Sequence, residues 1–285
     1  MTLYTSVRPR AGLERGAERV TPRAVAPPPS PPPPPSPGLP RRRLLGAAAP
    51  ALLGCACCAG AVRAAPGRNA FMDDLFAQAM AGGGMAAYES KIEPLKRRLF
   101  AAAAAAPRGR DLEVVEVGMG AGPNLEFLDP ERSRITAVDP NPFMRPYAER
   151  AAAERGWAPE RLRWVAGVAE ALPLADASAD LVVCTLVLCS VADVPRALGE
   201  AARVLRPGGR LLFIEHTAAR SAPFLRLKQA ILDPLQQLLA DGCHLCRDPL
   251  PAIEAAFGGA VEAERLVVPG QGLIGPHVAG IATRA

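Results

Sequence analysis

The chain has 285 residues, a formal net charge of +5 and 21% charged residues. The charge is unevenly divided: residues 1–68 hold ten arginines and two acidic residues, whereas residues 69–285 hold 23 basic and 26 acidic residues, a balance of −3. This distribution argues against nucleic-acid binding, because the basic patch it requires belongs on the folded part of a protein. About 215 residues are enough to bury one core.

Residues 1–68 are predicted to be a targeting leader, Pro-rich and largely disordered. Nine prolines between Pro27 and Pro37 permit only polyproline II structure or disorder. The Arg-rich, acid-poor sequence resembles an organellar transit peptide, and the arginines at 41–43 before a small and apolar stretch resemble a twin-arginine signal. We therefore expect a chloroplast protein, with the thylakoid as one destination. The alternative is a membrane anchor retained through residues 44–62.

Two amphipathic helices are expected at Phe71–Met80 and Met85–Phe100, separated by the glycines at 82–84. We expect them to form a lid over a bound cofactor. The apolar side chains expected to form the wall of the lid are Phe71, Met72, Phe76, Met80 and Met85.

Strands and helices then alternate along the chain. The strands are expected at Leu112–Val117, Arg134–Val138, Leu162–Ala166, Leu181–Thr185 and Arg210–His216, and the helices at Asn124–Leu128, Phe143–Arg155 and Val194–Leu205. Each strand is a nearly continuous apolar run, which is typical of a parallel sheet covered by helices on both faces.

The last third of the chain changes character. Helices are expected at Phe224–Leu239 and Pro249–Phe257, and strands at Val261–Val268 and Pro276–Thr283. The short loop between these two strands requires antiparallel pairing. The predicted fold class is therefore α/β, a doubly wound, mostly parallel seven-stranded sheet with a C-terminal antiparallel hairpin, an order of elements that resembles class I methyltransferases.

The sharpest motif is the run of alternating glycines Gly118, Gly120 and Gly122 after a β-branched strand. Missing Cβ atoms let a turn approach a ligand closely. Asp139 follows Gly118 by 21 residues, close to the offset at which a carboxylate binds ribose hydroxyls. The motif predicts a site for a nucleotide-type cofactor.

The identity of the cofactor follows from a departure in this motif. Pro123 stands where a dinucleotide fingerprint has the helix N-terminus that binds a pyrophosphate, and proline lacks an N–H to offer. S-adenosylmethionine has no phosphate, and Glu116 is placed to receive its ammonium group. We therefore expect S-adenosylmethionine as the cofactor.

His216, at the carboxyl end of the fifth strand, is the candidate catalytic base, because open α/β sheets gather their sites at that edge.

Cys243 and Cys246 flank a histidine, but no second Cys or His couplet with suitable spacing accompanies them, so no metal is expected. Cys184 and Cys189 are expected to be small apolar residues on or beside a buried strand, with pocket lining as the other interpretation of both; Cys184 is also a candidate cofactor-binding residue.

Several segments carry a narrower resemblance. These are Asp139–Pro142, Cys184–Ser190, Glu215–His216, Asp233–Pro234 and Asp241–Cys243. Together they resemble the methyltransferase-like seven family of thiol S-methyltransferases over about residues 70 to 285. The resemblance places Pro140 beside the cofactor, and the adenine ring against the backbone of Val168 and Ala169, with Glu170 as the nearby acid.

The resemblance implies methyl transfer from S-adenosylmethionine to a small-molecule acceptor, most simply an apolar thiol. Two alternatives remain open: a plastid quinone or lipid acceptor, and a non-catalytic, lipid-associated scaffold. Peripheral membrane association is a further expectation, and no oligomeric state is predicted.

Overall fold

The computed structural model describes residues 18–19, 69–105 and 107–285. The leader expected over residues 1–68, with its alternative anchor at 44–62, lies outside the described residues except for Glu18 and Arg19, and its role stays a prediction. Among the helices of the described residues, none has the length and apolar character needed to span a membrane.

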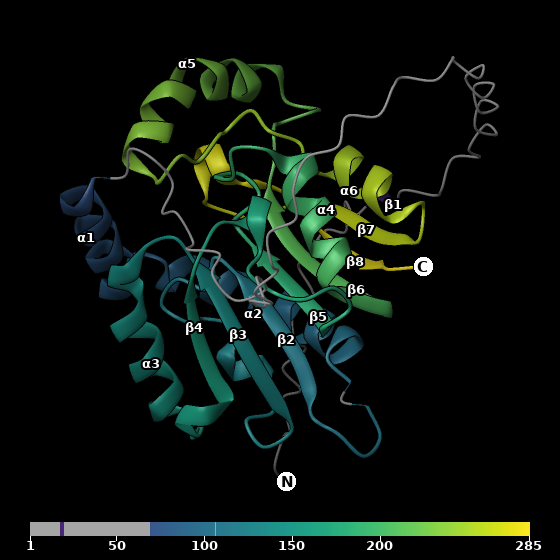
Figure 1. Ribbon diagram of the computed structural model, residues 1–285. Coiled ribbons are helices and arrows are strands. Elements are labelled where there is room, and N and C mark those ends of the chain that lie inside the picture. The colour runs from purple at the N-terminus through teal and green to yellow at the C-terminus, as the bar shows by residue number, and fades with distance from the viewer. Residues whose placement is uncertain (1–17, 20–68, 106) are drawn as a thin grey trace, which may run out of the picture. The chain divides into compact units, whose positions relative to one another are not determined.

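An eight-stranded sheet in the order β1-β7-β8-β6-β5-β2-β3-β4 forms the centre of the fold (Figure 1). Its strands are β1 (Glu18–Arg19), β2 (Leu112–Val117), β3 (Ser133–Asp139), β4 (Leu162–Ala166), β5 (Ala179–Thr185), β6 (Leu205–His216), β7 (Val261–Val267) and β8 (Pro276–Thr283). Strands β2 to β6 pair in parallel, whereas β8 is antiparallel to both β6 and β7. The seven expected strands and the C-terminal hairpin are confirmed. The two-residue β1, which pairs antiparallel with β7, was not expected.

The helices are α1 (Ala70–Ala79), α2 (Ala86–Ala103), α3 (Arg145–Glu154), α4 (Val194–Val204), α5 (Pro223–Leu239) and α6 (Leu250–Phe257). Short 3-10 turns occupy Leu125–Phe127, Pro142–Met144, Pro159–Arg161, Ala169–Ala171 and Gly272–Ile274, and a π turn occupies Met80–Gly84. The helix expected at Asn124–Leu128 is thus a single 3-10 turn. The glycines between α1 and α2 make the expected break, with Gly83 at a φ of 86°.

Alternate residues of the buried strands pack into two hydrophobic clusters. Val182 on β5 packs with Leu198 of α4 and Ile253 of α6, whereas its neighbour Val183 packs with Phe100 of α2. Because successive side chains of a strand point to opposite faces, these clusters mark the two faces of the sheet. This burial explains why the strand sequences are continuously apolar.

The start of β6 differs from the sequence prediction. The strand was expected to begin at Arg210, but it already begins at Leu205, and Gly208 within it has a left-handed φ of 77°. The register with β5 shifts between Ala179 and Leu181, so the additional residues form an irregularity within the ladder. A bulge of this kind absorbs extra residues on one strand while pairing continues.

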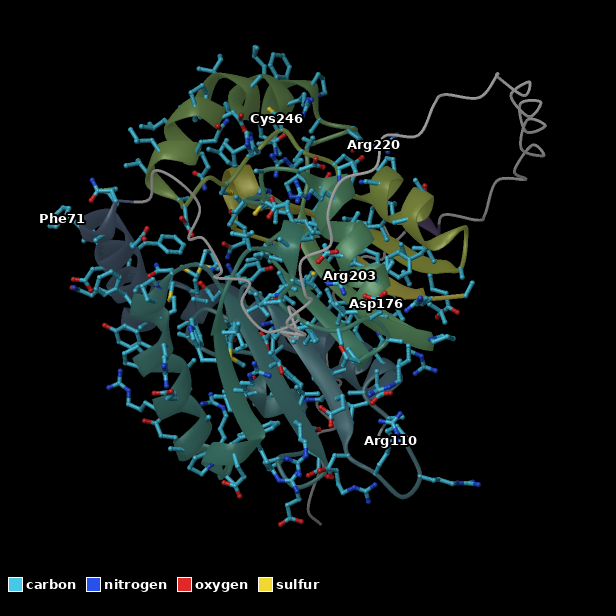
Figure 2. The ribbon with its side chains drawn as sticks, in the orientation of Figure 1. Phe71, Arg110, Asp176, Arg203, Arg220 and Cys246 are labelled. Carbon is cyan, nitrogen blue, oxygen red and sulfur yellow. The ribbon has the colours of Figure 1, made fainter. Side chains whose placement is uncertain are left out.

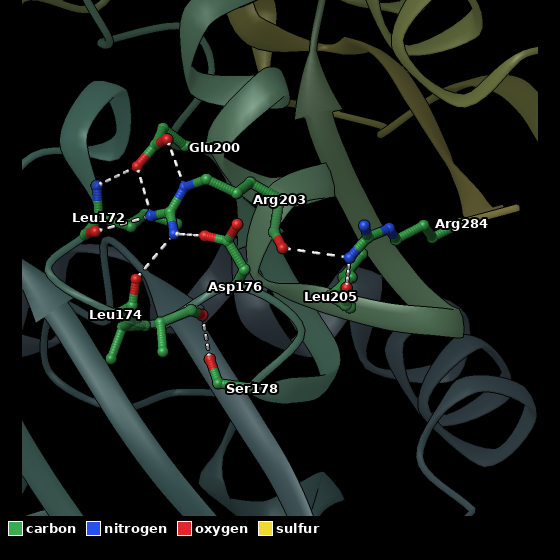
Figure 3. Close-up of polar contacts among 9 residues, drawn as sticks. Leu172, Leu174, Asp176, Ser178, Glu200, Arg203, Leu205 and Arg284 are labelled. Carbon is green, nitrogen blue, oxygen red and sulfur yellow. Dashed lines mark hydrogen bonds and ion pairs between the residues drawn. The ribbon is translucent and has the colours of Figure 1, made fainter.

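Arg203 holds the end of α4 against the loop before β5 (Figure 3). Its guanidinium donates to the carbonyls of Leu172 and Leu174 at 3.0 and 2.8 Å and pairs with Glu200 at 2.7 Å. Arg284, after β8, donates to the carbonyls of Arg203 and Leu205. The two guanidinium groups thus donate hydrogen bonds to main-chain carbonyls around the junction of α4 and β6.

Candidate active site

A cavity of about 740 Å³ lies at the carboxyl ends of the parallel strands. Its wall is formed by the loops that follow β2, β3, β4 and β5, and by residues of α1, α2 and the glycine segment between these helices. The size is typical of a small-molecule site, and its position is where open α/β sheets bind ligands.

The loop after β2 is built from glycine backbone. Gly118, Gly120 and Gly122 have φ values of 65°, 55° and 80°, in the left-handed region that other residues rarely adopt. A Cβ atom on Gly118 would lie 2.7 Å from Cγ2 of Val187, whereas one on Gly120 would meet nothing within 4 Å. All three glycines line the cavity. Gly120 is therefore the position at which the main chain is most open to a ligand.

Asp139, at the end of β3, is held at the cavity wall by main-chain donors. Its Oδ2 accepts from the N–H of Gly120 at 3.0 Å, and its Oδ1 accepts from the N–H of Asn141 at 2.8 Å. Asn141 donates in turn to the carbonyl of Asp73 on α1. These contacts fix the carboxylate in one orientation and join it to the helix above the cavity.

Glu116 lies on β2 directly behind the wall. The side chain is fully buried, and its Oε1 accepts from Nδ2 of Asn124 at 2.8 Å, while its Oε2 has no hydrogen-bond partner among the described residues. Burial raises the pKa of this carboxyl group to about 7. Its neighbours Val117 and Thr185 line the cavity. Glu116 itself does not line the cavity, so a cation bound there would reach its carboxyl group through water.

Of the remaining residues expected to bind the cofactor, four line the cavity and one lies in the core. Pro140, Val168, Ala169 and Glu170 line the cavity. Glu170 also binds the loop after β5, because its Oε1 accepts from the N–H groups of Ala192 and Asp193. Cys184 differs: it is 2% exposed and packs in the core below the cavity.

The expected lid contributes three of its five apolar residues to the wall. Phe76, Met80 and Met85 line the cavity, whereas Phe71 and Met72 do not. Phe71 is 73% exposed and points away from the fold (Figure 2). The face of α1 that packs on the domain does not include this position, so the expectation for Phe71 was wrong.

Helix α2 supplies polar residues that the sequence analysis missed. Lys96 is 1% exposed, lines the cavity and forms an ion pair with Glu89 at 2.6 Å. Tyr88, also on the wall, donates to Nε2 of His277 at 2.9 Å, because Nδ1 of that ring donates to the carbonyl of Gly275. The sequence did hold a signal for this position. Tyr88, Ile92 and Lys96 are spaced four residues apart, so the lysine lies on the same, buried face of the helix as the other two.

His216 does not line the cavity. Its Nε2 lies 3.0 Å from Sγ of Cys243, and the side chain is 2% exposed. Hydrogen bonding with Cys189 and His216 lowers the pKa of the Cys243 thiol. Cys189 is the third member of this cluster, and hydrogen bonding with Cys243 together with burial raises the pKa of its thiol. The histidine is therefore placed against two buried cysteines, next to the site.

Comparison with known proteins agrees with this geometry. A family model described as a methyltransferase domain matches residues 115–213. The chain is 38% identical over 201 residues to the human thiol S-methyltransferase TMT1A, covering 69% of this chain and 81% of the relative. It is 44% identical over 92 residues to the ubiquinone/menaquinone biosynthesis C-methyltransferase UbiE of Paracoccus denitrificans, covering 32% of this chain and 36% of that relative.

The fold also has solved counterparts. The crystal structure of the YcgJ protein from Bacillus subtilis superposes with a TM-score of 0.51 at 20% identity, covering 65% of this chain and 95% of that chain. At this identity the likeness supports the fold alone.

Replacing Asp139 tests the cofactor assignment. We expect Asp139→Ala to weaken S-adenosylmethionine binding about ten- to a hundred-fold, since losing a carboxylate that accepts from hydroxyls costs on the order of 1.5 to 3 kcal/mol. Asp129→Ala is the matched control, because Asp129 also accepts from a main-chain N–H but does not line the cavity. Calorimetry on both folded variants gives the answer, and equal affinities would contradict the assignment.

The buried carboxyl of Glu116 predicts a pH dependence of cofactor affinity. Its pKa rises from 4.5 to about 7 in the folded protein, so the group is mostly neutral below pH 7 and charged above it. A charged carboxylate binds the cofactor ammonium better, so affinity should increase between pH 6 and 8. The raised pKa also lowers the free energy of unfolding of the unliganded fold as the pH rises from 4.5 through 7, because the unfolded chain loses this proton first.

Glu116→Gln should abolish this pH dependence and lower the affinity at pH 8. Glu113→Gln on the same strand is the control and should keep the slope of the parent protein. If the slope persisted in Glu116→Gln, another group such as the buried Glu215, whose pKa is also about 7, would be responsible.

Proposed function

The chain belongs to the family of S-adenosylmethionine-dependent thiol S-methyltransferases, and we propose from this premise that it methylates the sulfur of a small apolar thiol. The observation that carries the proposal is the composition of the cavity wall. One part is the glycine loop with Asp139, which suits the cofactor; another part is apolar, from Phe76, Met80 and Met85. Flexible methionine side chains adapt to apolar ligands of varied shape.

Methyl transfer makes modest demands on the protein. S-adenosylmethionine, when bound, supplies an electrophilic methyl group on a sulfonium. The residues of this chain then have two tasks, to hold the acceptor in line at about 3 to 3.5 Å and to exclude water. Gly120 and Asp139 of the cavity wall, with Glu116 behind it, would orient the cofactor, and side chains of α1 and α2 would cover the acceptor. A thiol with a pKa near 8.5 needs little assistance to lose its proton.

An acceptor screen with labelled S-adenosylmethionine tests this function. We expect turnover of small alkyl thiols and none of phenols or carboxylates of similar size. The rate should rise with pH toward the pKa of each thiol, so an acceptor with a lower thiol pKa should reach its plateau at lower pH. Turnover of prenylquinols with no thiol activity would contradict the proposal and favour a quinone acceptor, the class named in the partial relative UbiE.

We also propose that the folded domain lies against a lipid surface through α5. Its outer face presents a stripe of large apolar side chains at helical spacing, namely Phe224, Leu227, Ile231, Leu235 and Leu238, each more than half exposed. Leu232 and Leu239 widen the stripe. A contiguous exposed apolar surface of this kind favours an interfacial helix, and the flanking cations Arg226 and Lys228 are complementary to anionic headgroups.

The position of α5 connects this surface with the cavity. The helix ends at Leu239, and Asp241, two residues later, lines the cavity. An apolar acceptor dissolved in the lipid would therefore reach the site over a short path.

Vesicle binding tests the lipid contact. The full chain should co-sediment with vesicles of phosphatidylcholine and phosphatidylglycerol, and Ile231→Glu should reduce the bound fraction several-fold, because it places a charge in the apolar stripe. Ala101→Glu adds the same charge to the exposed surface of α2 and should leave binding unchanged. Equal binding by the two variants would show that α5 does not contact lipid.

A further inference from the structure

We propose that Cys189, His216 and Cys243 form a binding site for a thiophilic metal ion, zinc. One ligand atom from each residue lies within 4.8 Å of the others, and all three side chains are buried. No metal was expected from the sequence, because Cys243 and Cys246 lack a second couplet. The fold instead supplies partners for Cys243 from positions 27 and 54 residues earlier in the chain.

The three residues lie on separate elements that the main chain already joins. Cys189 is in the loop after β5, His216 ends β6, and Cys243 follows α5. The N–H of His244 donates to the carbonyl of Cys189 at 2.9 Å. The guanidinium of Arg247 donates to the carbonyls of the same loop at Leu188, Cys189 and Val191. The scaffold thus fixes the ligands in place before an ion binds, as a metal site requires.

The set of donor atoms matches zinc. Two cysteine sulfurs and one imidazole nitrogen are ligands that Zn²⁺ prefers, and three protein ligands leave one tetrahedral position for a fourth ligand. Two thiolates and a neutral imidazole also balance the charge of a divalent ion. A neutral assembly is what a buried site can accommodate, since an isolated charge in the interior is costly.

The surroundings of the cluster hold unsatisfied polar atoms and negative charge. Nδ1 of His216 and Oε2 of Glu215 have no hydrogen-bond partner among the described residues, although both side chains are at most 2% exposed. Glu215 uses its other oxygen to accept from the N–H groups of Val187 and Leu188. A cation at the cluster would stabilise this buried carboxylate together with the thiolates.

The site would stabilise part of the cavity wall. Ser190 and Asp241, which line the cavity, are one and two residues from Cys189 and Cys243. An ion bound by both cysteines would therefore link the two loops that carry these wall residues. The inference does not depend on which acceptor the enzyme uses, because metal content is measured without one.

Metal analysis of the full chain tests the site. The chain is purified with zinc chloride and a reductant, dialysed, and analysed by mass spectrometry for zinc per chain. We expect one zinc per chain in the parent protein, and at least a ten-fold loss in Cys189→Ser and in Cys243→Ser. Cys246→Ser is the matched control and should keep its zinc, because Cys246 lies three residues from Cys243 but outside the cluster.

Two measurements on the parent protein keep the test independent of how well the variants fold. Zinc X-ray absorption should show a first shell containing both sulfur and nitrogen, and cobalt substitution should give the thiolate-to-cobalt charge-transfer band of a tetrahedral site. Absence of zinc in the reduced parent chain, a disulfide between Cys189 and Cys243 in its place, or equal zinc loss in Cys246→Ser would each overturn the proposal.

Discussion

The geometry of the cavity depends on the hydrogen bond from the Gly120 main chain to the Asp139 carboxylate. It joins the loops that follow two neighbouring parallel strands, and it forms only because the glycine backbone turns with positive φ. Asp139 also accepts from the main chain of Asn141, whose side chain binds α1. One carboxylate therefore fixes the floor of the site and, through Asn141, the position of the helix above it.

Much of the fold and of the cavity wall could be predicted, because these features depend on residues that are close together in the sequence. Continuous apolar runs identified the strands, the short loop before Pro276 required an antiparallel pair, and the spacing of Gly118 and Asp139 located the cofactor wall. What could not be predicted depends on residues far apart in the sequence. Burial of Lys96 beside Glu89 requires α2 to lie over the cavity, and a cysteine 27 residues from His216 meets its ring only after folding. The early start of β6 was missed for a related reason, since Leu205 joins the sheet only by pairing with Ala179 of β5.

Several ionisable side chains in this fold are buried, which lowers the stability of the folded state. Burial raises the pKa of both Glu116 and Glu215 to about 7, and Lys96 is held in the interior by an ion pair. Replacement of such groups by apolar residues of similar size is often neutral or stabilising in other proteins. Their presence around one cavity and one cysteine cluster is therefore better explained by ligand binding than by stability.

The antiparallel insertion of β8 has a consequence for how the molecule assembles. β7 meets β6 only through β8, so the edge of β6 stays unpaired until β8 of the hairpin docks on it. The hairpin can form from local contacts, whereas the parallel strands must first close long crossover connections. Until β8 pairs with it, β6 presents an edge with unpaired backbone groups that includes the apolar run at residues 211–214. Such an edge is a template for intermolecular β-pairing, which makes the interval before hairpin docking the stage most vulnerable to aggregation.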